Sequence, residues 1–169
     1  IVDTGPLLFL SKIDRLSILE KFGQILVPTG VISEIKHKQD EALTAVVKAT
    51  KDWLSIGTVK DKNLFKVLSK ELDEGESEVI CLAMEQKAKW VILDDHDARR
   101  FAHRYGLNVI GTLGILAWAK KKRFITNFRV EVLKLQKAGF YATPILIERL
   151  LKETGESTLS ISHKGDIPA

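Results

Sequence analysis

Acidic residues occur in this sequence at points where short apolar segments end. Asp3 follows an apolar pair and precedes Thr-Gly-Pro, while Asp94 and Asp95 follow the apolar run 88–93. In open parallel α/β sheets, chemistry is placed outside the carboxyl ends of the strands, so carboxylates there are candidate site residues. For Asp3 an N-cap of the following helix is an equal alternative, because aspartate accepts hydrogen bonds from the first helical amides.

Two glutamates lie near the starts of predicted helices. Glu34 lies early in a helix predicted from residue 29 onward, directly after a strand at 24–28 that ends in proline. Glu76 lies in the acidic segment 72–78, which suits a helix N-terminus and is followed by an apolar run. In a parallel sheet these positions fall on the same edge as the aspartates.

A cluster of four or five carboxylates indicates a site for divalent cations. Without cations the carboxylates repel one another and some of their pKa values rise. Oxygen ligands suit Mg²⁺ or Mn²⁺, and no Cys or His pair is spaced to bind Zn²⁺. The four histidines lack a nearby nucleophile motif, which disfavours Ser-His-Asp and Cys-His catalysis. The pattern therefore favours metal-dependent chemistry on phosphodiesters.

Helical and strand-like segments alternate along the chain. The strand-like segments after the first residues are 24–28, 53–59, 88–93 and 107–110. Such alternation predicts an α/β fold with right-handed crossovers and a mainly parallel central sheet flanked by helices. The glycines of segment 111–114 are expected to serve tight helix packing, because the lysine of a phosphate-binding Walker motif is missing.

The C-terminal part is expected to add a helical hairpin to this sheet. Two helices, at about 128–137 and 144–153, would form the hairpin within residues 124–156. We therefore expect one α/β domain over 1–156. The segment 157–169 is short of large apolar side chains and is expected to be a flexible tail.

The composition fits one domain in a reducing compartment. The chain has 169 residues, of which 45% are hydrophobic and 28% charged, enough for a sizeable core. The single cysteine, Cys81, lies in an apolar run and cannot form an intramolecular disulfide, so we expect a cytoplasmic protein. We find no apolar run long enough to span a bilayer and expect no membrane segment. The net charge of +4 permits a polyanionic partner without requiring one.

Taken together, these motifs resemble the PIN-domain nucleases. The resemblance rests on Asp3-Thr4 after a strand, Val31-Ile32-Ser33-Glu34-Ile35, Leu72-Asp73-Glu74-Gly75-Glu76 before an apolar helix, and Val91-Ile92-Leu93-Asp94-Asp95. The branch that it resembles most has Asp-Thr-Gly-Pro-Leu at the start, Gly-Glu-Ser-Glu in the middle and Gly-Thr-Leu-Gly at 111–114. Many members of that branch are toxin components of VapBC-type toxin–antitoxin pairs. The resemblance covers roughly residues 1–122 and the C-terminal hairpin.

The resemblance implies a metal-dependent endoribonuclease that acts on single-stranded RNA and has a three-layer Rossmann-like fold. It implies that four catalytic acids, Asp3, Glu34, Glu76 and Asp94, bind Mg²⁺ or Mn²⁺. Asp95 or Asp97 would be an auxiliary acid. The third acid is usually aspartate in the family, and here it is either Glu76 or Glu78. This departure leaves a catalytically degenerate PIN-like module, which binds RNA or protein, as the alternative. A phosphatase on a similar sheet is disfavoured because the Asp-x-Asp expected after its first strand is missing.

Basic residues near the acidic edge are candidates for RNA contact, because phosphate binding needs cations around an acidic, metal-filled pocket. The candidate substrate-binding residues are Thr4, Arg99, Arg100 and Arg104, together with Lys36, Lys38 and the run 120–123. The resemblance also implies RNA as a partner, an antitoxin protein and a homodimer.

Overall fold

Helices and short strands alternate along the chain, as the sequence predicts for an α/β fold. The computed structural model describes residues 1–38 and 41–156, and the expected flexible tail at 157–169 lies outside these residues. The helices are α1 (Thr4–Lys12), α2 (Ile18–Phe22), α3 (Thr29–Lys38), α4 (Ala42–Thr50), α5 (Lys62–Leu68), α6 (Glu74–Glu85), α7 (His96–Arg104), α8 (Thr112–Lys121), α9 (Phe128–Lys137) and α10 (Pro144–Glu153). The strands are β1 (Ile25–Pro28), β2 (Leu54–Gly57), β3 (Val91–Ile92) and β4 (Val109–Ile110).

The strands form a parallel sheet around residues 1–3. β1 pairs with β2 and β3 pairs with β4, both in parallel. The Val2 amide donates to the Leu26 carbonyl at 3.0 Å, and the Asp3 amide donates to the Ile92 carbonyl at 3.0 Å. Residues 1–3 therefore lie between the two strand pairs, with a parallel bridge between Val2 and Ile92. The predicted mainly parallel central sheet is confirmed.

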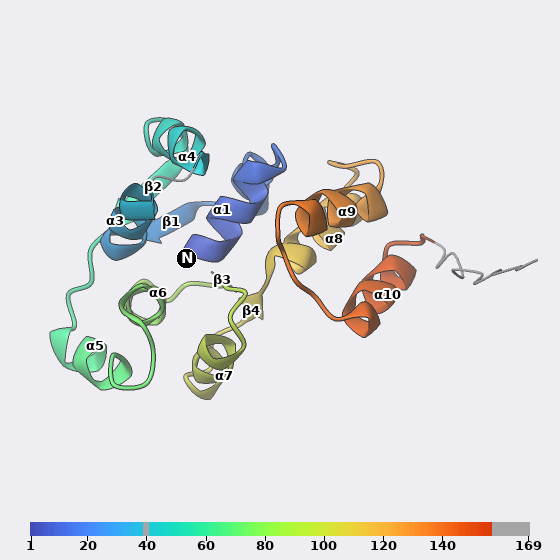
Figure 1. Ribbon diagram of the computed structural model, residues 1–169. Helices are drawn as coiled ribbons and strands as arrows, with labels where there is room; N and C mark the ends of the chain where they lie inside the picture. The colour runs from blue at the N-terminus through green and yellow to red at the C-terminus, as the bar shows by residue number, and fades with distance from the viewer. Residues whose placement is uncertain (39–40, 157–169) are drawn as a thin grey trace, which may run out of the picture.

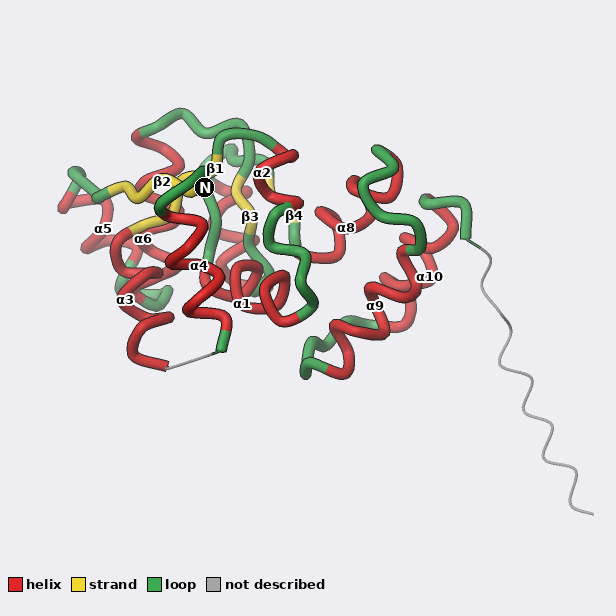
Figure 2. Tube along the Cα trace, turned by 90° about the horizontal axis from the view of Figure 1, so that it is seen from above, coloured by secondary structure: helices red, strands yellow, loops and turns green. Residues whose placement is uncertain are grey.

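The sheet lies between two groups of helices. Figure 1 shows α1, α4 and α9 on one side of the strands and α5, α6 and α7 on the other. The packing agrees, because α1 contacts α3, α4, α8 and α9, whereas α6 contacts α3, α5, β1 and β3. Seen from above in Figure 2, α8, α9 and α10 lie together at one end of the molecule. This is the predicted three-layer arrangement with two further helices at the C-terminal end.

One cluster of buried apolar side chains joins both helical layers to the sheet. Val27 of β1 and Ile92 of β3 are at most 1% exposed, as are Leu7 of α1 and Ile80 of α6. Burial on both faces explains why β1 and β3 are continuously apolar. The core therefore fixes the carboxyl edge of the sheet, where the acidic residues follow. None of the helices within 1–38 and 41–156 combines the length and the apolar character needed to cross a bilayer.

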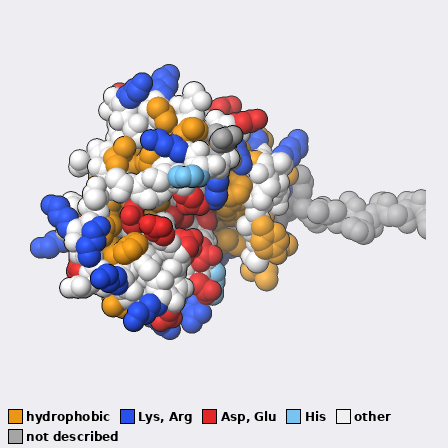
Figure 3. Space-filling view, turned by 60° about the vertical axis from the view of Figure 1, so that its left-hand side comes forward, with side chains coloured by type: hydrophobic (Ala, Val, Ile, Leu, Met, Phe, Trp, Pro, Cys, Tyr) orange, Lys and Arg blue, Asp and Glu red, His pale blue; other side chains and the backbone are white. Residues whose placement is uncertain are grey.

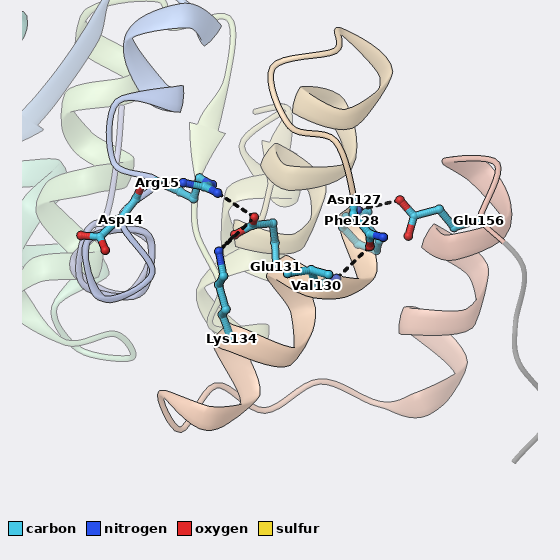
Figure 4. A network of polar contacts seen from close by, with 8 residues as sticks. All are labelled: Asp14, Arg15, Asn127, Phe128, Val130, Glu131, Lys134 and Glu156. Carbon is cyan, nitrogen blue, oxygen red and sulfur yellow. Dashed lines mark hydrogen bonds and ion pairs between the residues drawn. The ribbon is translucent and has the colours of Figure 1, made fainter.

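The helices α9 and α10 are tied to the rest of the molecule and to each other by the contacts of two glutamates (Figure 4). Glu131 of α9 is 4% exposed and accepts hydrogen bonds from Arg15 at 2.8 Å and from Lys134 at 3.3 Å. Glu156, just after α10, accepts hydrogen bonds from the amide of Phe128 at 2.6 Å and from the next amide of α9. The Arg15–Glu131 contact holds the hairpin against the segment between α1 and α2, and the Glu156 contacts hold α10 against α9.

Replacing Arg15 with Met is expected to lower the free energy of unfolding by about 1–2 kcal/mol. The variant removes the 2.8 Å ion pair between Arg15 and the buried Glu131 carboxylate. Within the described residues, Glu131 then keeps only its longer ion pair with Lys134, at 3.3 Å. Urea denaturation measures the change. Lys121→Met is the control, because Lys121 is half-exposed and pairs with Glu153 at 3.5 Å, so its loss should cost less than about 0.5 kcal/mol. Equal losses in both variants would contradict the anchoring role of Glu131.

Candidate functional site

The carboxyl edge of the sheet gathers acids from several elements. Asp3 ends the segment paired between β1 and β3, Asp94 comes two residues after β3, and Glu34 lies in α3, directly after β1. Glu76 reaches the same edge from the first turn of α6, which packs against α3, β1 and β3. Figure 3 shows Asp and Glu side chains in a band across the middle of one face, with Lys and Arg around its periphery. We call Asp3, Glu34, Asp73, Glu76, Asp94 and Asp95 the acidic cluster.

Asp3 is the most deeply buried acid of this cluster. It is 9% exposed and stands at the N-cap position of α1, where its side chain forms no capping hydrogen bond with the described residues. Burial, reinforced by the negative charges of Asp73 and Glu34, raises the pKa of Asp3 to about 7. The nearby amides of Thr4 and Gly5 offset only part of this rise. An N-cap role alone therefore does not account for the Asp3 carboxylate.

Glu34 is held as an ionised carboxylate by two donors. The Thr4 hydroxyl donates to Glu34 Oε2 at 2.5 Å, and Lys38 Nζ donates to Oε1 at 2.6 Å. Burial acts to raise the pKa of Glu34, but the hydrogen bonds from Lys38 and Thr4 outweigh it and lower the pKa. Gly75 keeps space open here, since a Cβ on it would lie 3.3 Å from Glu34 Oε2 and 3.5 Å from Asp73 Oδ1. Thr4 and Lys38, both predicted to contact substrate, are thus engaged with Glu34.

Glu76 lies among the charges of the acidic cluster, whereas Glu78 lines a cavity beside Glu34 and Asp73. Burial and the charges of Asp73, Asp95 and Asp3 raise the pKa of Glu76 to about 7. Glu78 Oε2 instead accepts a hydrogen bond at 2.6 Å from an amide in the first turn of α3. Residues two apart on an α-helix are rotated by about 200°, so the two glutamates approach the cluster from different sides of α6.

Asp73 and Glu76 also form a capping box at the start of α6. The Asp73 carboxylate accepts a hydrogen bond from the Glu76 amide at 2.8 Å, and the Glu76 carboxylate accepts one from the Asp73 amide at 3.3 Å. Such reciprocal bonds satisfy two amides that the helix itself leaves unpaired. The capping box therefore fixes where the Glu76 side chain lies relative to the sheet edge.

Asp94 is oriented by Thr112 at the start of α8. The Thr112 amide donates to Asp94 Oδ1 at 2.8 Å, and its hydroxyl donates to Oδ2 at 2.5 Å. Burial raises the pKa of Asp94, while the Thr112 hydrogen bonds and the charge of Arg99 oppose the rise. Arg99 is itself held by the Leu93 carbonyl at 3.1 Å. Gly111 is required by this close approach, because a Cβ there would lie 2.8 Å from both Asp94 Oδ1 and Arg99 Nη1.

Replacing Thr112 with Val is expected to destabilise the protein by about 1–2 kcal/mol, because Asp94 Oδ2 loses its hydroxyl donor in a buried site. Thr112→Ser keeps the donor and should recover most of the loss. Thermal and urea denaturation at neutral pH measure both variants. Thr50→Val is the matched control, because the Thr50 hydroxyl bonds only a backbone carbonyl of its own helix. Failure of the serine variant to recover stability would contradict the role of the hydroxyl.

The remaining predicted residues lie on or beside α7. Asp95 Oδ1 caps α7 by accepting hydrogen bonds from two amides of its first turn, at 2.8 and 2.9 Å. Arg100 lies 3.4 Å from the Asp97 carboxylate, and Arg104 lies over the ring of Phe101 at 5.3 Å. These contacts place Arg100 and Arg104 on α7 itself, whereas Arg99 lies beside an acid of the cluster.

Sequence reasoning missed two residues of this region, Asp73 and Thr112. The charge of Asp73 helps to raise the pKa values of both Asp3 and Glu76. In the sequence, Asp73 could have been recognised from the capping-box spacing Asp-x-x-Glu over 73–76. Thr112 is fully buried, and its signal was a hydroxyl residue two positions after a predicted strand, on the edge where the acids lie.

A cavity of about 620 Å³ opens between the N-terminal turns of α3 and α6. Glu34, Asp73 and Gly75 line it, together with His37. Solvent and solutes can therefore reach Glu34 and Asp73 from this side.

The donors of the acidic cluster fit a hard divalent cation, although they do not form a closed cage. Among residues 1–38 and 41–156, no three Asp, Glu, His or Cys side chains converge in a way that could hold one ion. All donors of the cluster are carboxylate oxygens, and burial with mutual repulsion raises the pKa values of Asp3 and Glu76. Mg²⁺ usually keeps several waters and binds through one or two carboxylates. A pair of these carboxylates with water therefore suits Mg²⁺ or Mn²⁺.

Comparison with protein families agrees with the fold. The family model DUF3368, described as a PIN domain, matches residues 1–156. Searches of curated proteins and of solved structures gave no match. PIN domains are generally nucleases with a Rossmann-like α/β fold, and this chain has parallel strands with acids at their carboxyl edge. The chain belongs to the PIN-domain family.

Proposed function

We propose that this protein is a Mg²⁺- or Mn²⁺-dependent endoribonuclease that hydrolyses phosphodiester bonds of single-stranded RNA. The observation that carries the proposal is the gathering of Asp3, Glu34, Glu76 and Asp94 at one edge of a PIN-domain sheet. Buried carboxylates that repel one another favour a bound cation. A divalent cation at such an edge is suited to phosphodiester hydrolysis.

Each acid has a separate task in this proposal. Asp3 and Glu76, with pKa values near 7, bind the cation when they lose their protons near neutral pH. Thr112 holds both oxygens of Asp94 in a fixed orientation, and Glu34 is kept ionised by its hydrogen bonds. When bound, Mg²⁺ or Mn²⁺ lowers the pKa of the attacking water and neutralises charge on the phosphate. Water then adds to phosphorus as the bond to the leaving sugar oxygen breaks.

A cleavage assay on a labelled, unstructured single-stranded RNA tests this function. Cleavage is expected with Mg²⁺ or Mn²⁺ and not with EDTA. Glu76→Gln should slow cleavage by roughly 100-fold or more, as does loss of a group that stabilises transition-state charge. Glu71→Gln removes the same charge from an exposed residue before α6 and should leave the rate unchanged. Cleavage that persists in EDTA or in Glu76→Gln would contradict the proposal.

We also propose that the nuclease is the toxin of a toxin–antitoxin pair and acts in the cytoplasm as a homodimer. The support is the resemblance of the Asp-Thr-Gly-Pro-Leu start and the Gly-Glu-Ser-Glu segment to that branch. Expression of the wild-type chain should then arrest growth, and Asp3→Asn should relieve the arrest. Sedimentation of the purified protein as a monomer would contradict the dimer.

The second candidate is a PIN-like module that binds RNA or protein without cutting. Two observations favour it: the third acid is a glutamate, and the acids of the described residues form no closed metal cage. Binding of RNA without cleavage in Mg²⁺ and Mn²⁺ would support this candidate over the nuclease.

A further inference from the structure

A second groove begins at the acidic cluster and extends toward the C-terminal helices. It has a volume of about 560 Å³, and Asp94 lines it together with residues of α7, β4, α8 and α10. Figure 1 shows α7 and α10 on either side of β4. Ile110, Leu113 and Leu146 give the groove an apolar lining. A solute in this groove would thus be in contact with an acid of the candidate site.

Two arginines line the groove and supply positive charge. Arg99 is fixed beside Asp94 through its hydrogen bond to the Leu93 carbonyl. Arg149 reaches the groove from α10, and its side chain is 67% exposed. Its ion pair with Glu153 is long, at 3.8 Å, so Arg149 can turn toward an anion in the groove at little cost.

An exposed aromatic side chain stands at the same groove. Tyr141, in the link between α9 and α10, is 83% exposed, although its neighbour Phe140 packs edge-on against Phe9 with ring centroids 5.0 Å apart. The packed Phe140 fixes the backbone from which Tyr141 projects. Both aromatic residues line the groove. A solvent-exposed ring beside arginines is a stacking surface for an unpaired base.

We propose that this groove, the α10 groove, binds a nucleotide of single-stranded RNA that flanks the scissile phosphate. The base stacks on Tyr141 above the apolar lining, and Arg99 and Arg149 bind the phosphates on its two sides. The inference rests on the proposed nuclease function and assigns the path of the substrate strand beyond the acids. The groove volume lies in the range of about 300–1,000 Å³ that is typical of small-ligand sites, which suits one nucleotide and not a duplex. Paired bases are also unavailable for stacking, so unpaired RNA is preferred.

RNA affinity, measured by fluorescence anisotropy, tests the α10 groove independently of cleavage. The full chain carrying Asp3→Asn is titrated in Mg²⁺ with a fluorescein-labelled unstructured RNA and with the same RNA annealed to its complement. Adding Tyr141→Ala should weaken binding of the single strand by roughly 5- to 100-fold, the effect of losing one base–aromatic stack. Tyr141→Phe should retain the affinity. Adding Arg149→Ala should reduce the slope of log Kd against log salt by about 0.7, the value for one phosphate contact on a single strand.

Two residues of α10 that lie outside the groove serve as controls. Ile145 is 80% exposed, and neither Ile145 nor Lys152 lines the groove as the structure describes it. Ile145→Ala and Lys152→Ala should therefore leave the affinity and the salt slope unchanged. Unchanged affinity in Tyr141→Ala, or a Tyr141→Ala variant that alters self-association instead of RNA binding, would overturn the groove while leaving the nuclease function standing. Absence of any RNA binding would overturn both together.

Discussion

Asp3→Asn is expected to abolish metal-dependent RNA cleavage while making the metal-free protein more stable at about pH 8. The two effects have one cause, because burial and neighbouring charges make the ionised Asp3 carboxylate unfavourable unless a cation balances it. Asparagine keeps the shape of the side chain and removes its charge. The variant should lose roughly 100-fold or more in cleavage rate.

The sign of the stability effect follows from the pKa of Asp3, which rises from 3.8 to about 7 on folding. A carboxyl whose pKa is raised in the folded state favours folding while protonated, and this contribution is lost as the pH rises through about 7. At about pH 8 the wild type carries the full cost of the charge, on the order of 4 kcal/mol, and Asp3→Asn carries none. Urea denaturation in EDTA measures the gain. Asp52 is an exposed residue after α4, and the control Asp52→Asn should change neither the stability nor the cleavage rate. A less stable Asp3→Asn at this pH would contradict the argument.

Divalent cations are expected to stabilise the wild type strongly above pH 7 and weakly near pH 5. Asp3 and Glu76 both have pKa values of about 7, so protons occupy the proposed ligands in acid and the metal competes poorly. A metal concentration 100 times its Kd adds about 2.7 kcal/mol, which corresponds to a rise in Tm of roughly 5–10 °C for a chain of this size.

Thermal denaturation with Mg²⁺ or Mn²⁺, compared with NaCl at equal ionic strength, measures this effect. In EDTA the wild type should lose stability as the pH rises from about 4 to about 7, because both raised carboxyls ionise over that range. The double variant Asp3→Asn with Glu76→Gln should show neither the pH dependence nor the metal-induced rise in Tm. A metal effect equal at both pH values, or retained in the double variant, would refute the assignment of these acids as ligands.

The sheet and the order of its elements follow from local patterns in the sequence. The apolar run that ends at Pro28 predicted β1, because parallel strands are buried on both faces. The run 88–93 yielded only Val91–Ile92 as a strand, since pairing with β4 is limited to two residues. Helix α2 begins at Ile18, and Asp14 before it adopts a left-handed conformation with a φ of 56°.

The candidate site was harder to predict, because sequence shows which residues end a strand and not how side chains pair across the sheet edge. Sequence alone could not choose between Glu76 and Glu78, whereas the helix directs them to opposite sides. The Thr112 contact with Asp94 joins residues 18 apart in sequence, and the Thr4 contact with Glu34 joins residues 30 apart. The groove at Tyr141 depends on where α10 packs, which no local pattern encodes.

Calorimetric titration with Mn²⁺ at about pH 7.5 tests the central claim most directly, namely that the acidic cluster binds a divalent cation for phosphodiester hydrolysis. The wild type is predicted to bind Mn²⁺ saturably at submillimolar concentrations, and Asp3→Asn and Glu76→Gln should each bind it at least about 10-fold more weakly. Asp52→Asn should bind as the wild type does. A wild-type protein that takes up no Mn²⁺ at millimolar concentrations would contradict the account.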